Sequence, residues 1–118
     1  MILVDTSVWI EHFRSGSPEL ETLLNEGAVA CHPFIIGELA CGNLKNRGEI
    51  LSLLKELPLA FCAEDDEVLQ FIYDHGQMGK GLGYIDIHLL MSALLTRVPL
   101  WTFDKRLHEA SLALLPMH

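Results

Sequence analysis

Four acidic residues of this 118-residue chain occupy positions where an ionised side chain is unexpected. Asp5 ends the apolar run MILVD, and Asp104 directly follows the apolar run PLWTF. Glu38 and Asp86 each lie within a long apolar stretch that holds no other ionised side chain, if histidines are counted as neutral. Because a buried carboxylate without a partner is costly, these placements suggest that the four acids share a purpose.

Carboxylates that the fold brings together need a positive charge between them. Two of them ~4 Å apart repel by about 4 kcal/mol at an effective dielectric constant near 20. Oxygen ligands without thiolate or imidazole favour a hard ion, Mg²⁺ or Mn²⁺. Such an ion lowers the pKa of a bound water and stabilises the charge that develops on a phosphodiester during hydrolysis. If the four acids converge, they predict a metal-assisted hydrolytic site.

Each acid taken alone also has an ordinary structural interpretation, and these alternatives stay open. Asp5 and Asp104 can cap the helices that follow them. Asp86 can be a first-turn acid that interacts with the helix dipole. Glu38 fits such a role least well, because it lies mid-helix among apolar residues, and its structural alternative is a rim position that reaches solvent.

Strand-like and helix-like segments alternate along the chain. Apolar runs predict strands at 1–5, 28–32 and 98–103, and a weaker strand at 59–62. Helical spacing and capping residues predict helices at 6–17, 17–27, 33–44, 46–58, 63–77, 84–97 and 104–115. The alternation predicts one α/β domain over residues 1–118, a three-layer α/β/α arrangement with a central parallel sheet flanked by helices. Sites in such sheets gather at the carboxyl ends of the strands.

Composition limits the partners and the compartment. Sixteen acidic against eight basic residues give a net charge of −8, which argues against a broadly basic nucleic-acid surface but leaves local attraction possible. The three cysteines are widely spaced and suggest core residues in a reducing cytoplasm rather than a disulfide or zinc framework. We expect no signal peptide and no membrane span, because the N-terminus lacks a basic region and no apolar run reaches ~18 residues.

Half of the residues are hydrophobic, which suffices for a core without disulfides. We expect that such a chain has more apolar surface than one small core covers. The sequence therefore suggests a homodimer, with the helices after residue 43 as contributors.

Four stretches of the chain resemble the PIN-domain nucleases, and within them the VapC-type toxins of bacterial toxin–antitoxin pairs. The stretches are MILVDTSVWIEHFR, HPFIIGELACGNL, GLGYIDIHLLMSALL and PLWTFDKRL, and they occur in the family's order over nearly the whole chain. The resemblance implies a metal-dependent endoribonuclease that uses Mg²⁺ or Mn²⁺ and no small-molecule cofactor. It implies an acidic pocket of Asp5, Glu38, Asp86 and, at a more variable fourth position, Asp104, with Asp5 and Asp86 as metal ligands. It further implies a homodimer that a VapB-like antitoxin silences.

Supporting residues follow from the same resemblance. Thr6 and Ser7 match the hydroxyls that come after the first acid, and Thr102 matches the hydroxyl before the fourth. Basic side chains expected near the strand ends are candidates for binding the RNA substrate, with ordinary solvated charges as the alternative. They are Arg14, Lys80, Lys105 and Arg106.

Three ring-bearing residues close to these motifs have structural roles as their first interpretation. We expect Trp9 and Trp101 to be core or interface residues rather than base-stacking platforms. We expect His88 to be a helix-face histidine, with a role toward the site or the substrate as the alternative.

Rival functions of another class remain to be weighed. A phospho-receiver domain is also a small α/β unit with an acidic pocket, but the chain has no adjacent acid pair after its first strand. A Mg²⁺-dependent phosphohydrolase with Asp5 as nucleophile usually has a second acid two residues later, where Ser7 stands. A catalytically silent binding module of the same fold is the third alternative, and the intact acid set argues against it.

Overall fold

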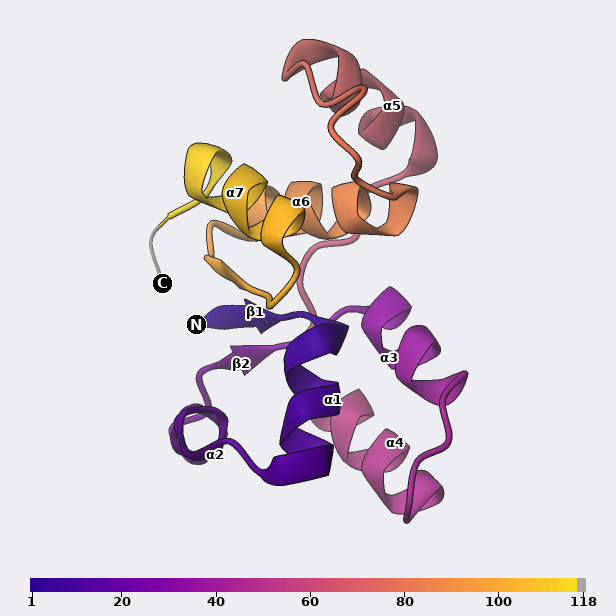
Figure 1. Cartoon of the computed structure of the whole chain (residues 1–118), viewed down its shortest axis with the longest axis vertical. Helices are drawn as coiled ribbons and strands as arrows, with labels where there is room; N and C mark the ends of the chain where they lie inside the picture. The colour runs from indigo at the N-terminus through magenta and orange to yellow at the C-terminus, as the bar shows by residue number, and fades with distance from the viewer. Residues whose placement is uncertain (117–118) are drawn as a thin grey trace.

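The fold is known from a computed structural model that describes residues 1–116. A parallel sheet of three short strands, in the order β2–β1–β3, lies at the centre of the described chain. Helices α6 and α7 lie above the sheet in the view of Figure 1, and helices α1, α2 and α4 lie below it. The α/β prediction with helices on both sides of a parallel sheet is confirmed. The elements are β1 (Ile2–Val4), α1 (Thr6–Ser15), α2 (Pro18–Asn25), β2 (Val29–Ala30), α3 (Pro33–Ala40), α4 (Arg47–Glu56), α5 (Asp65–Asp74), α6 (Tyr84–Thr96), β3 (Leu100–Trp101) and α7 (Lys105–Leu114).

The central strand β1 is buried along its whole length, as a strand covered on both faces should be. Leu3 pairs with Ala30 on one side and with Leu100 on the other. The weak strand predicted at 59–62 is reduced to a single bridge between Cys31 and Leu59. The ladder stops there because the opposite chain leaves the sheet directly after Cys31, where His32 caps α3 and Pro33 begins it.

Local capping chemistry sets the helix boundaries. Ser17 caps α2 by accepting from the backbone N–H of Leu20, and Gly27, with φ of +67°, ends the turn that follows. For α1, the capping role considered for Asp5 is confirmed. Asp5 is the N-cap, because its carboxylate lies within reach of the Ser7 backbone N–H.

The cysteine prediction holds for one residue of three. Cys31 is buried, and burial raises the pKa of its thiol to about 11, so it behaves as a small apolar core residue. The core assignment is wrong for Cys41 and Cys62, which are exposed because one caps the end of α3 and the other lies beyond the Cys31–Leu59 bridge. Within residues 1–116 no helix combines the length and apolar character needed to cross a membrane.

Helix α5 projects from the main body at the top of Figure 1 and packs against α6. Its first turn carries three acids, where the helix dipole favours them, and it buries Val68 and Phe71. Because α6 begins directly below α5, side chains of α5 reach the same end of α6 that carries Asp86.

Candidate acidic active site

Asp5 lies at the carboxyl end of the central strand and is 7% exposed. Its Oδ2 atom accepts from the Thr102 hydroxyl at 2.8 Å and from the Ser7 hydroxyl at 2.9 Å. Thr102 follows the neighbouring strand β3, and the Asp5 backbone N–H donates to the Trp101 carbonyl at 2.9 Å. The parallel pairing of β1 and β3 therefore brings these groups together, and the two hydroxyls satisfy a carboxylate that would otherwise be costly to bury.

Asp104 is connected to Asp5 through Thr102. The backbone N–H of Asp104 donates to Thr102 Oγ1 at 3.0 Å, and the same hydroxyl donates onward to Asp5. Asp104 is also the N-cap of α7, because its Oδ1 atom accepts from the Leu107 N–H at 2.9 Å. One hydroxyl thus fixes the spacing of two acids that stand at the ends of adjacent strands.

Asp86 lies in the first turn of α6, where the backbone N–H of Gly83 donates to its Oδ2 atom at 3.2 Å. Burial raises the pKa of this carboxyl, the Gly83 hydrogen bond lowers it, and the negative charges of Asp5 and Asp104 raise it further. Three acids from distant parts of the sequence therefore lie close enough to interact electrostatically.

Asp5, Asp86 and Asp104 do have the capping or first-turn roles considered for them, and these roles do not prevent a chemical role. Asp5, Asp86 and Asp104 each use one carboxylate oxygen toward the backbone at the start of a helix. In each case the hydrogen bonds described for the side chain fall on that one oxygen, so the second oxygen remains available. The caps therefore orient the carboxylates without occupying them.

Glu38 reaches this group by a different route. It is exposed on α3, and its Oε1 atom accepts from the Thr6 hydroxyl at 2.8 Å. Because Thr6 follows Asp5, the bond places the Glu38 carboxylate next to the first acid. The burial cost anticipated for an acid within an apolar helix does not arise, since Glu38 occupies the rim position considered as its structural alternative.

A divalent ion fits the donor chemistry of this site. Among residues 1–116 no group of three or more carboxylate, imidazole or thiolate side chains lies close enough together to form a ready-made metal centre. Mg²⁺ does not require one, because it keeps several waters and is commonly held by one or two carboxylates. Burial raises the pKa of Asp86, and the charges of Asp5 and Asp104 raise it further, so a cation at this place would stabilise its ionised form.

The basic residues expected near the site lie in separate places. Arg14 is largely exposed, forms a 3.7 Å ion pair with Glu11 and lines a cavity of about 740 Å³ that also includes Glu38. Lys80 and Arg106 line a small cavity of about 160 Å³ between the loop before α6 and the start of α7. Lys105 is exposed in the first turn of α7.

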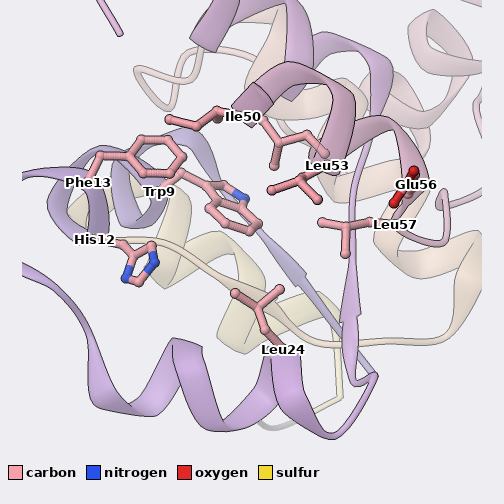
Figure 2. Close-up of a pocket in the computed structure, with 9 residues that line it drawn as sticks. Trp9, His12, Phe13, Leu24, Ile50, Leu53, Glu56 and Leu57 are labelled. Carbon is pink, nitrogen blue, oxygen red and sulfur yellow. The ribbon is translucent and has the colours of Figure 1, made fainter. Parts of the chain in front are cut away.

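An apolar cavity of about 460 Å³ lies between α1, α2 and α4. Figure 2 shows the Trp9 indole across its centre, with Phe13 beside it and Leu24 on the opposite wall. The expectation that Trp9 is a core or interface residue agrees with its 3% exposure, yet its indole nitrogen has no hydrogen-bond partner in the described part of the chain. This cavity shares Phe13 and Ile50 with the cavity that contains Glu38, so the two are neighbours.

Two features near the site were not anticipated from the sequence. The Arg106 side chain packs on the backbone of Gly81, whose φ of +74° and lack of a Cβ make room for it. His32 is buried, caps α3 through Nδ1 and contacts the Ser92 hydroxyl of α6 at 3.1 Å. The sequence held one signal for each feature. The glycine-rich run GKGLG could have indicated the close approach at Gly81, and a histidine directly before the helix-opening Pro33 could have indicated the cap of α3.

Comparison with known proteins gives the family. The PIN-domain family model matches residues 2–112. Ribonuclease VapC32 of Mycobacterium tuberculosis strain CDC 1551 / Oshkosh is 47% identical over 111 residues, which cover 93% of this chain and 90% of that protein. Ribonuclease VapC32 of strain ATCC 25618 / H37Rv matches with the same values. The chain therefore belongs to the PIN-domain family and, within it, to the VapC type.

Proposed function

We propose that the chain is a metal-dependent endoribonuclease and the toxin of a type II toxin–antitoxin pair, and that it acts in the cytoplasm. The observation that carries this proposal is the hydrogen-bonded connection of Asp5 and Asp104 through Thr102 at the carboxyl edge of the sheet, with Asp86 near enough for both charges to raise its pKa. The similarity to proteins named ribonucleases supports RNA as the substrate. A phospho-receiver function is disfavoured because no adjacent acid pair follows the first strand. A phosphohydrolase with Asp5 as nucleophile is disfavoured because Ser7, which hydrogen-bonds Asp5, stands where its second acid would be.

In this proposal Asp5 and Asp86 hold Mg²⁺ or Mn²⁺, which when bound supplies an acidified water and charge stabilisation at the phosphodiester. The remaining groups orient the ligands and the proton acceptor. Thr102 and Ser7 keep the free oxygen of Asp5 turned toward the site, and the Gly83 N–H does the same for Asp86. The exposed carboxylate of Glu38 is placed to accept a proton from the attacking water.

The chemistry is tested by the products and by chelation. Purified protein should cut single-stranded or loop RNA only with Mg²⁺ or Mn²⁺ present and leave 5′-phosphate and 3′-hydroxyl ends. Cleavage that continues in excess EDTA, or products with 2′,3′-cyclic phosphates, would contradict the proposal. Expression of the chain alone, and then together with its neighbouring gene, tests the toxin role through growth and RNA integrity.

The antitoxin is proposed to occupy these two neighbouring cavities. An apolar segment fits the cavity around Trp9, and a backbone carbonyl there can accept from the unpartnered indole N–H. The neighbouring cavity leads from Phe13 and Ile50 to Glu38, so the same segment can bring an arginine to the acidic site. An arginine at the carboxylates would displace both metal and substrate.

Competition between metal and peptide tests this arrangement. A peptide of the antitoxin tail should bind less tightly at high Mn²⁺ than at low Mn²⁺ when the ionic strength is matched. Its affinity should fall in Asp5→Ala and Glu38→Ala variants. Affinity that is unchanged by Mn²⁺ and by both substitutions would show that the partner silences the enzyme by another route.

A homodimer is part of the proposal. Large apolar side chains remain exposed after residue 43, among them Leu69 at 57%, Tyr73 at 74% and Met78 at 56%. Their burial against a second copy would remove apolar surface that the core leaves uncovered. Sedimentation at tens of micromolar protein should show a dimer, and a monomer under those conditions would contradict this part of the proposal.

A further inference from the structure

Three rings gather where α3 and α6 begin. The His88 ring lies 4.8 Å from the Phe34 ring and 4.7 Å from the Tyr84 ring between centroids, at interplanar angles of 69° and 89°. His88 is only 2% exposed, whereas Phe34 is 38% exposed and Tyr84 is 43% exposed. A buried imidazole therefore supports two aromatic rings that present part of their surface to solvent.

Other contacts hold these rings in place. The Tyr84 hydroxyl donates to Asp65 Oδ1 at 2.9 Å, and His88 Nε2 contacts the same oxygen at 3.2 Å. Phe34 packs against the buried His32 ring, with centroids 5.1 Å apart. Because the rings are ordered before any ligand arrives, a planar ligand that stacks on them loses little binding energy to ordering side chains.

One of the two exposed rings shares a helix face with an acid of the site. Phe34 and Glu38 are four residues apart on α3, so their Cβ atoms are about 6 Å apart on that face. Tyr84 begins the first turn of α6 two residues before Asp86, and side chains at that spacing point to different sides of a helix. A flat group resting on Phe34 and Tyr84 would therefore approach the place where the phosphodiester is proposed to be cut from the Phe34 side, next to Glu38.

We propose that Phe34 and Tyr84 form a nucleobase subsite, on which one unpaired base of the RNA substrate stacks. This inference rests on the proposed ribonuclease function. An uncharged base suits this location, because a phosphate would be repelled by the surrounding carboxylates, and bases are commonly stacked on aromatic side chains in single-stranded RNA recognition.

Asp65 gives the subsite a preference among bases. Its Oδ1 atom is engaged by Tyr84 and His88, while the side chain as a whole remains 80% exposed. The free Oδ2 atom is an acceptor and offers no donor. It therefore favours guanine, adenine and cytosine, which present an exocyclic amino group, over uracil, whose single N3–H donor lies between two carbonyl oxygens that a carboxylate repels.

Steady-state kinetics on a short single-stranded RNA tests the stacking. Phe34→Leu and Tyr84→Leu should each raise KM by about 5-fold to 100-fold with little change in kcat, the range expected for loss of one base stack. Tyr84→Phe keeps the ring and should restore most of the affinity. Phe61→Leu is the matched control, because Phe61 is an exposed aromatic residue at 68% that lies near the other end of α6.

A base-by-base scan sharpens the test. In wild-type protein, replacing one particular base by an abasic residue should raise KM at least as much as Phe34→Leu does, and adding Phe34→Leu to the abasic substrate should raise it no further. Asp65→Asn should reduce the preference for an amino-bearing base at that position. The inference would be overturned if Phe34→Leu and the abasic replacement raised KM additively at every position of the RNA. It would also be overturned if Phe34→Leu and Tyr84→Leu had the same kinetics as Phe61→Leu.

Two further readouts separate this inference from the function on which it rests. If the wild-type protein does not cut RNA, the ribonuclease proposal fails, and quenching of a 2-aminopurine base in bound RNA still reports whether a base stacks on the rings. If the ring variants weaken binding of the antitoxin tail peptide but leave RNA kinetics unchanged, the rings serve the protein partner and the subsite assignment is wrong.

Discussion

The acidic site has a sheet side and a helix side, and they are built differently. On the sheet side, Asp5 and Asp104 share the Thr102 hydroxyl, and Asp5 is buried with two hydroxyl donors. On the helix side, Glu38 and Asp86 stand on separate helices and each accepts one hydrogen bond. The sheet side is fixed by strand pairing, whereas the helix side depends on how α3 and α6 are held relative to each other.

A buried histidine joins those two helices. His32 Nδ1 accepts from the Phe34 backbone N–H at 3.0 Å, so that nitrogen carries no proton in this arrangement. The other nitrogen, Nε2, then carries the hydrogen and donates to the Ser92 hydroxyl of α6 at 3.1 Å. Burial, together with the charge of nearby His88, lowers the pKa of His32 from 6.5 to about 4.

The largest expected effect is loss of cleavage when either side loses its proposed metal-binding acid. Asp5→Asn and Asp86→Asn should each reduce the cleavage rate by about 100-fold or more, since each removes a charge on which the reaction depends. In EDTA at neutral pH, the thermal midpoint of Asp86→Asn should be unchanged or higher, because burial and the charges of Asp5 and Asp104 raise the pKa of this carboxyl and so disfavour its ionised form in the fold.

Asp104→Asn is the matched comparison for these two variants. Its amide oxygen can still accept from the Leu107 N–H, and water can replace the fourth acid on Mg²⁺, so the loss of activity should be smaller. An inactive Asp104→Asn together with an active Asp86→Asn would reverse the proposed ranking of the two sides.

As the pH falls, the contacts of His32 that join α3 and α6 on the helix side should weaken before those of the sheet side. Between pH 6.5 and about 4 the unfolded chain binds a proton at His32 that the folded chain does not, so the free energy of unfolding falls as the pH drops through this window. The loss attributable to His32 is at most about 3 kcal/mol. Urea titrations across this range measure it.

Two substitutions isolate the contribution of His32. His32→Gln should lower stability near neutral pH but flatten the dependence between pH 6.5 and 4. His108→Gln, at an exposed histidine of α7, should leave the wild-type slope unchanged. Equal slopes in wild type and His32→Gln would mean that carboxylates, not this histidine, govern the acid response.

A smaller effect is expected when the shared hydroxyl of the sheet side is removed. Thr102→Val leaves the Asp104 N–H without its acceptor and Asp5 with one hydroxyl fewer, at a cost of about 1–3 kcal/mol in the free energy of unfolding. Thr102→Ser keeps the hydroxyl and should recover most of that stability and activity. A serine variant as damaged as the valine variant would point to lost methyl packing instead.

The two sides of the site also differ in how well the sequence could predict them, as the fold and the four acids show. Alternation of apolar runs and helical spacing was enough for the parallel α/β fold, because strand and helix periodicities are local properties of the chain. The four acids were recognisable because each interrupts an apolar run or ends one. Their structural capping roles and their proposed chemical roles turned out to be compatible, which sequence alone presented as alternatives.

What the sequence could not predict depends on contacts between distant residues. Exposure of Glu38 follows from the orientation of α3 and from its bond to Thr6, which lies 32 positions away. The bond between His32 and Ser92 spans 60 positions, and no local pattern indicates it. The ring cluster at Phe34 depends in the same way on how α3 and α6 meet.

The smallest expected effect tests whether the helix side is as loosely held as its contacts suggest. Thr6→Val removes the hydroxyl that donates to Glu38, but the carboxylate is exposed and water can take the place of that donor. The free energy of unfolding should therefore change by about 0.5 kcal/mol or less, the usual range for a surface substitution. Cleavage should fall modestly, because Glu38 loses its orientation but keeps its charge. If Thr6→Val instead destabilises the protein or slows cleavage as much as Thr102→Val, Glu38 is held as firmly as Asp5, and the distinction between the two sides fails.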